Sequence, residues 1–162
     1  MSSESGSESH IVHEVIYLYF KGVAQRNDGP AGAGVIAEDV DTGKVFSISK
    51  SLGRRTNFQA EYDSLIFGLQ HLMELENHEV LSLIILSNNE VVVDQLNGDS
   101  VVKNDKLLDL RKEAVELLKE FGPIQIENIS TKKSERYKKN IEKAKELASK
   151  AIRRSDNSEN ND

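Results

Sequence analysis

The stretch Thr56-Asn57-Phe58-Gln59-Ala60-Glu61-Tyr62 decides the fold, because it marks where three predicted strands give way to the first helix. Thr56 has the character of a helix N-cap, and Gln59 stands three residues later, where it completes a capping box. The helix that follows carries an apolar stripe that ends near residue 76, formed by Ala60, Leu65, Leu69, Leu72 and Met73. The stretch therefore predicts an amphipathic helix that packs one face against a sheet.

Three strands are predicted before this helix. Residues 15–20 (VIYLYF) are rich in β-branched and aromatic side chains, which favours a strand. A turn at residues 27–30 (NDGP) leads to a second strand over residues 34–39. A hairpin turn at residues 41–44 leads to a third strand over residues 44–51. We expect these three strands to form an antiparallel meander.

Strands and helices alternate in the rest of the chain. Residues 80–86 (VLSLIIL) form a continuous apolar run, which is typical of a strand buried on both faces. We then expect a short helix capped by Ser87 and Asn88, a helix from residue 104 or 105 to Gly122-Pro123, a strand over residues 124–129 and a helix over residues 139–153. The order βββαβααβα predicts an α/β fold, a five-stranded mixed sheet with helices on both faces.

Composition bounds the class of protein. The 162 residues suffice for one core, and we interpret the polar segments 1–10 and 154–162 as disordered tails around a single domain at residues 11–153. The chain has no Cys, which excludes disulfides and Cys-ligated metal sites. The first residues lack the features of a secretory signal, and no apolar run approaches the length of a membrane span. We therefore expect no membrane association and a cytoplasmic or nuclear location.

The charge is unevenly distributed. The net charge of −6 argues against indiscriminate binding of nucleic acid. Residues 130–154, however, hold ten Lys or Arg against three Glu, a local net charge of +7. This basic segment suggests an anionic partner or an acidic counter-surface within the chain, and a solvated amphipathic helix explains it equally well.

Five motifs, in the right order, resemble those of the ribonuclease H family, in particular its compact form without a long basic insertion. Residues 18–35 are similar to the family's first strand, glycine-rich loop and second strand, and residues 56–62 are similar to T-N-N-x-A-E-Y. Residues 86–98 resemble S-D-S-x-x-V-V followed by Q-L-N-G, and residues 102–104 resemble the link to the next helix. Ala144, Leu147 and Ala148 stand as in A-D-x-L-A of the last helix. The resemblance implies a ribonuclease H-like fold.

The resemblance also implies a site in which four carboxylates hold two divalent cations around the scissile phosphate. The four positions fall on Lys21, Glu61, Asn88 and Lys145, so Glu61 alone keeps its carboxylate. Lysines repel a divalent cation, and an amide oxygen is a weaker ligand than a carboxylate. We therefore expect a degenerate pocket with no metal, no other cofactor and no catalytic residue. Lys21 and Lys145 then either pair with Glu61 or stand exposed at the ends of their elements.

These substitutions predict a catalytically inactive domain, a pseudoenzyme that serves as a nucleic-acid-binding or protein-scaffolding module. Its expected partner is RNA, an RNA–DNA hybrid or another protein. The alternative is an active, metal-dependent RNA–DNA hybrid ribonuclease whose ligands have moved.

Nine residues are candidates for contact with nucleic acid. They are Asn27, Thr56, Asn57, Gln59, Lys132, Lys133, Arg136, Lys138 and Lys139. The first four match or flank positions that contact the nucleic-acid backbone in the family, and the other five could bind phosphates. Each set also has an ordinary explanation, since the first suits turns and helix caps and the second suits a solvated loop.

Overall fold

The computed structural model describes residues 14–161, with side chains described as far as Arg154. One five-stranded sheet has the order β4-β3-β2-β5-β6. Its strands are β2 (Val15–Ala24), β3 (Gly29–Asp39), β4 (Val45–Arg55), β5 (Ser82–Ser87) and β6 (Ile124–Asn128). The first three strands pair antiparallel, whereas β2 with β5 and β5 with β6 pair parallel. The predicted α/β fold with a mixed sheet is therefore confirmed.

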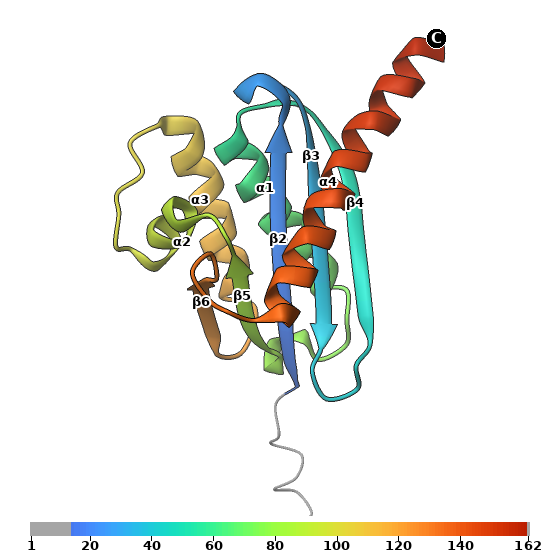
Figure 1. Cartoon of the computed structure of the whole chain (residues 1–162). Helices are drawn as coiled ribbons and strands as arrows, with labels where there is room; N and C mark the ends of the chain where they lie inside the picture. Colours follow the sequence, from blue (N-terminus) through green and yellow to red (C-terminus); the bar gives the residue numbers. More distant parts are fainter. Residues whose placement is uncertain (1–13, 162) are drawn as a thin grey trace, which may run out of the picture.

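Helices cover both faces of this sheet, with α1 and α3 on one side and α4 on the other (Figure 1). The helices are α1 (Asn57–Leu72), α2 (Glu90–Asn97), α3 (Asp105–Leu118) and α4 (Glu135–Asn161), and two short 3-10 helices are η2 (Gln25–Asn27) and η3 (His78–Val80). A hydrophobic cluster lies on each face of the sheet, and neighbouring residues of β2 belong to different clusters. Leu18 and Phe20 pack toward α1, whereas Tyr19 packs toward α4. The described helices include none that is long and apolar enough to cross a membrane.

Glycines of β3 bring α4 unusually close to the sheet. A Cβ atom at Gly34 would overlap the carbonyl group of Ala144, and one at Gly32 would overlap that of Ala148. The small residues on both sides therefore allow backbone to pack on backbone. This contact fixes which side of α4 faces the sheet, and so decides where its charged residues point.

Several element boundaries differ from those that the sequence predicts. Strands β3 and β4 are longer than expected, and the N-cap of α2 is Asn89, whose side chain accepts a hydrogen bond from Val92 N. Helix α4 begins at Glu135 rather than residue 139, because the Ser134 hydroxyl accepts a hydrogen bond from Tyr137 N.

The two segments predicted as tails are described to different extents. The first tail, residues 1–10, lies outside the described residues. At the other end, α4 continues to Asn161, through residues for which the sequence predicts a disordered tail. Extending an established helix by one residue costs far less than starting one, which accounts for the longer helix. The limits of the domain at residues 11 and 153 stay a prediction.

Candidate functional site

Three of the four positions of the predicted pocket meet at one end of the central strands. Lys21 lies near the end of β2, Glu61 lies in the second turn of α1, and Asn88 follows β5. The Lys21 Nζ donates to Asn88 Oδ1 at 2.9 Å and lies 3.4 Å from Glu61 Oε2. Because β2 and β5 run parallel, their ends reach the same edge of the sheet. The ammonium group of Lys21 therefore joins two positions at which the family has carboxylates.

Glu61 is held rigidly beside the end of β2. Its side chain is 1% exposed, and its Oε1 accepts a hydrogen bond from the backbone N–H of Gly22. A Cβ atom at Gly22 would overlap the carbonyl group of Ala60, so glycine allows α1 to lie directly against β2. The Ser64 hydroxyl also reaches Lys21 O at 2.9 Å. These contacts position the carboxylate through backbone packing as well as through Lys21.

Burial raises the pKa of Glu61 above its ordinary value, because the buried site disfavours the charged form. The Lys21 ammonium, the N–H of Gly22 and the side chain of Asn89 all oppose this shift. Asn89 is thus a residue of the site that sequence reasoning missed. The available signal was its position directly after Asn88, the residue matched to the third family carboxylate.

Lys145 does not complete the group in the way that Lys21 does. It is exposed, and among the described residues no hydrogen bond or ion pair connects it to Glu61. It follows Ala144, whose carbonyl group lies against Gly34, and Gly34 is the sheet partner of Lys21. Lys145 is thus on the part of α4 nearest the site without a contact to Glu61.

Glu142 is a carboxylate close to this site. It lies one helical turn before Lys145, so the two residues share a side of α4. Glu142, Lys133 and Lys138 line a hollow of about 560 Å³ together with Asn88. The other carboxylates near the family positions have different surroundings, since Asp63 pairs with Arg55 and Asp28 pairs with Arg54.

The arrangement does not fit the pair of divalent cations that the resemblance implies. A metal pair needs several clustered carboxylates. Within residues 14–161, no group of three or more His, Cys, Asp or Glu side chains could hold a metal ion. The Lys21 ammonium also lies between Glu61 and Asn88, where a cation bound by both would have to sit.

The four predicted nucleic-acid contacts before and in α1 form one hydrogen-bonded corner. Asn57 Oδ1 accepts from Ala24 N at 2.9 Å, and Asn27 Oδ1 accepts from Asn57 N at 2.8 Å. Thr56 and Gln59 form the predicted capping box. Both also line a hollow of about 600 Å³ with Arg54 and Lys106. The structure therefore gives all four residues local roles and leaves the amide groups of Asn27 and Asn57 exposed.

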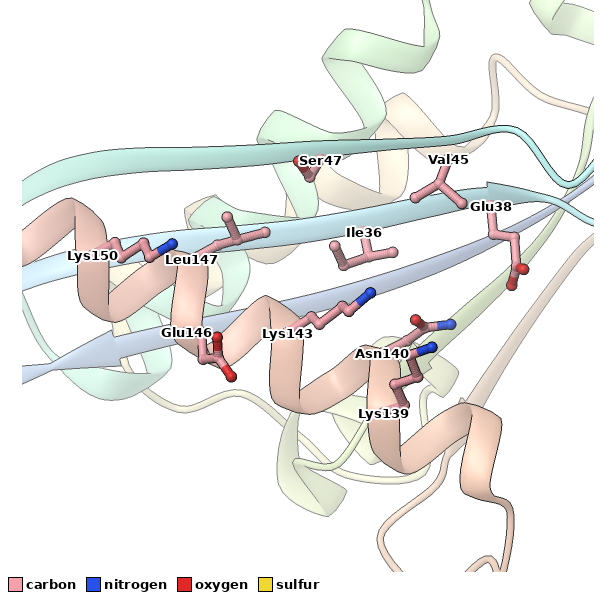
Figure 2. Close-up of a pocket in the computed structure, with 10 residues that line it drawn as sticks. All are labelled: Ile36, Glu38, Val45, Ser47, Lys139, Asn140, Lys143, Glu146, Leu147 and Lys150. Atoms are coloured by element: carbon pink, nitrogen blue, oxygen red, sulfur yellow. The ribbon is translucent and has the colours of Figure 1, made fainter.

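The five predicted basic contacts are divided between two sides of α4. Lys133 and Lys138 line the hollow with Asn88, as does Lys132, which also pairs with Glu127 at 3.1 Å. Arg136 instead pairs with Glu38 at 2.9 Å. Figure 2 shows Lys139 in a separate groove, between α4 and strands β3 and β4. The five residues thus do not form a single patch.

Comparisons with known proteins agree with this fold. A family model described as reverse transcriptase-like matches residues 19–151. A bifunctional protein of Mycobacterium tuberculosis is 36% identical over 107 residues, which are 65% of this chain and 29% of that protein. Ribonuclease HI of Halobacterium salinarum is 31% identical over 121 residues, which are 75% of this chain and 59% of that protein. The chain thus spans less than two thirds of the length of either relative.

A solved structure of similar sequence has the same fold. The crystal structure of LC11-RNase H1 in complex with an RNA/DNA hybrid is 29% identical, with a TM-score of 0.76. The match covers 86% of this chain and 98% of that chain. The similarity therefore extends over nearly the whole described domain.

These relatives correct one prediction made from the sequence. Because they are named Ribonuclease HI and RNase H1, they point to an enzyme, and the prediction of a pseudoenzyme is wrong. That prediction took the loss of three family carboxylates as the loss of activity. Magnesium in phosphoryl-transfer sites is often held by only one or two carboxylates together with substrate phosphates. The match over residues 19–151 and these similarities together show that this chain belongs to the ribonuclease H family.

Proposed function

We propose that this chain binds an RNA–DNA hybrid on the face that carries Lys21, Glu61 and Asn88, and that it hydrolyses the RNA strand there. The observation that carries the proposal is the family match over residues 19–151, with relatives named as ribonucleases H. The retained Glu61, buried at the end of the two central strands, supports placing the reaction at this point.

The surface around the site suits a polyanionic duplex. Lys133 and Lys138 stand beside the hollow that reaches Asn88, and neither forms an ion pair among the described residues. Near the end of β2, the exposed residues Asn27 and Asn57 offer side-chain N–H donors for phosphate or sugar oxygens. Binding of a backbone by such donors positions a duplex without regard to its sequence.

The carboxylate that we assign to the reaction is that of Glu142. Both oxygens of Glu61 are engaged, by Gly22 N–H and by Lys21, so Glu61 acts mainly by holding Lys21 in place. Glu142 is exposed and lines the hollow that Asn88 also lines. An exposed carboxylate next to the bound phosphate can orient or deprotonate an attacking water. Glu142 is thus the relocated counterpart of the missing family carboxylates.

A cleavage assay tests both parts of this proposal. An end-labelled RNA strand, paired with DNA, is incubated with the protein in magnesium and in manganese, and the products are separated on a denaturing gel. We expect cleavage of RNA in the hybrid and a large loss of rate in Glu142→Gln, because the variant lacks the carboxylate. The matched control is Glu146→Gln, which removes an exposed carboxylate from the separate groove in Figure 2.

The possible results are distinct. No cleavage by the unaltered protein in either metal would contradict the proposed activity. Equal rates in Glu142→Gln, Glu146→Gln and the unaltered protein would leave a ribonuclease but overturn the role of Glu142.

A further inference from the structure

The Lys21 ammonium occupies the position of a cation in this site. Its Nζ lies 2.9 Å from Asn88 Oδ1 and 3.4 Å from Glu61 Oε2, between the side chains that stand at two family ligand positions. The neighbouring carboxylate neutralises Lys21, and no third charged group contacts this pair among the described residues. A pocket of four carboxylates would repel a phosphate until metal ions bound, whereas this pocket has no such net negative charge.

The ammonium group retains the capacity to bind a ligand. A lysine ammonium has three N–H donors, and the contacts to Glu61 and Asn88 use two of them. The Lys21 side chain is 18% exposed, against 1% for Glu61, so the remaining donor can be reached from the surface. A phosphate oxygen is a strong acceptor for such a charged donor.

We propose that Lys21 is a built-in cation that donates to a phosphate of the RNA strand, so that a hybrid binds at this site without a divalent cation. The inference rests on the hybrid binding proposed above and assigns to one residue the contact that metal ions make in the family. The positions of Glu61 and Asn88 give the ammonium its direction, in the way that ligands fix a bound metal.

Binding measurements on four variants test this role. Fluorescence anisotropy of a labelled RNA–DNA hybrid gives the affinity in EDTA and in magnesium at constant ionic strength. In magnesium the reading is taken before cleavage begins, and a denaturing gel of the same sample establishes that the RNA is still uncut at that time. Lys21→Gln removes the charged donor and leaves Glu61 without its ion-pair partner. The double variant Lys21→Gln/Glu61→Gln also lacks the charged donor but restores the original net charge of the pair. Lys150→Gln is the matched control, since it removes one lysine from the groove in Figure 2.

The affinity of the unaltered protein is expected to be the same in EDTA and in magnesium. We expect Lys21→Gln and the double variant to bind about tenfold more weakly, the effect of one lost charge-assisted hydrogen bond. Lys150→Gln should bind nearly as the unaltered protein does. Thermal unfolding of each variant establishes that the protein still folds, and Lys21→Arg, which keeps a charged donor, should recover part of the affinity.

Other results would overturn the inference. Binding that requires magnesium, or a double variant that binds as tightly as the unaltered protein, would show that the Lys21 ammonium is not the contact. A loss of affinity as large in Lys150→Gln would show a general effect of charge. No binding of hybrid by the unaltered protein would instead overturn the proposed function itself, and this inference with it.

Discussion

At the scale of single residues, the ionisation of Glu61 depends strongly on its burial. Its carboxylate is removed from water, and burial is the largest influence on its pKa. The pKa is raised even though Lys21, Gly22 N–H and Asn89 favour the charged form. The desolvation cost therefore outweighs these partners, and ionised Glu61 reduces the stability of the fold.

This imbalance predicts a dependence of stability on pH. Because its pKa is raised in the fold, Glu61 contributes stability that is fully present below about pH 4.5 and is lost as the pH rises through the raised value. We expect the free energy of unfolding of the unaltered protein, relative to Glu61→Gln, to fall as the pH rises above that point. Urea titrations across this range measure the difference, and a difference that grows with pH would contradict the account.

At the scale of secondary-structure elements, an ion pair fixes the junction between β4 and α1. Arg55 Nε lies 2.8 Å from Asp63 Oδ2, and the Asp63 side chain is 8% exposed. We expect Arg55→Ala to cost about 2 kcal/mol, because it leaves a buried carboxylate without its partner. Arg54→Ala is the matched control, since both side chains of the Arg54–Asp28 pair are exposed and such pairs contribute less than about 1 kcal/mol. Chemical unfolding of both variants checks this, and equal losses would contradict it.

The elements themselves are largely predictable from the sequence. The capping box at Thr56 and Gln59 and the apolar run before Ser87 give α1 and β5 their types and approximate positions. The first residue of α4 is harder to predict from the sequence. The lysine-rich sequence after Ser134 has helix formers but few apolar residues to mark a buried face. Tertiary contact with the glycines of β3 determines which side of this helix is buried.

The site was predictable only in part, because some of its residues are placed by tertiary contacts that the sequence pattern does not specify. The resemblance brings Lys21, Glu61 and Asn88 together, because they lie on elements whose order and pairing follow from the fold. The positions of Glu142 and Asn89 in the site depend on where their helices begin and on the rotamers of their side chains. The motif spacing specifies neither. The resemblance also assigns functional positions without showing whether a neighbouring side chain has taken over a role.

At the scale of the whole molecule, α4 separates two basic surfaces. Lys133 and Lys138 border the hollow next to Asn88. Lys143 and Lys150 border the groove of about 370 Å³ in Figure 2, which also contains Glu38 and Glu146. No described residue lines both hollows. The two surfaces can therefore be tested separately with variants of equal charge.

The dependence of hybrid binding on salt distinguishes these surfaces. Each lysine that neutralises a phosphate contributes about 0.9 to the slope of log affinity against log salt concentration. We expect Lys133→Gln/Lys138→Gln to reduce the slope by nearly two, and Lys143→Gln/Lys150→Gln to leave it almost unchanged. Affinities measured over a series of salt concentrations give both slopes. A larger reduction in the second variant would place the duplex on the groove side of α4.

The central claim is that an RNA–DNA hybrid binds where Lys21, Glu61 and Asn88 meet, and an NMR titration of the amide groups with hybrid tests it most directly. We predict that the signals of Gly22, Asn89 and Glu142 move in EDTA as hybrid is added, because these amides lie at or beside the site. The signals of Ser47 and Leu147, in the groove of Figure 2, should stay in place. Shifts confined to Ser47 and Leu147, or no shifts at saturating hybrid, would contradict the account.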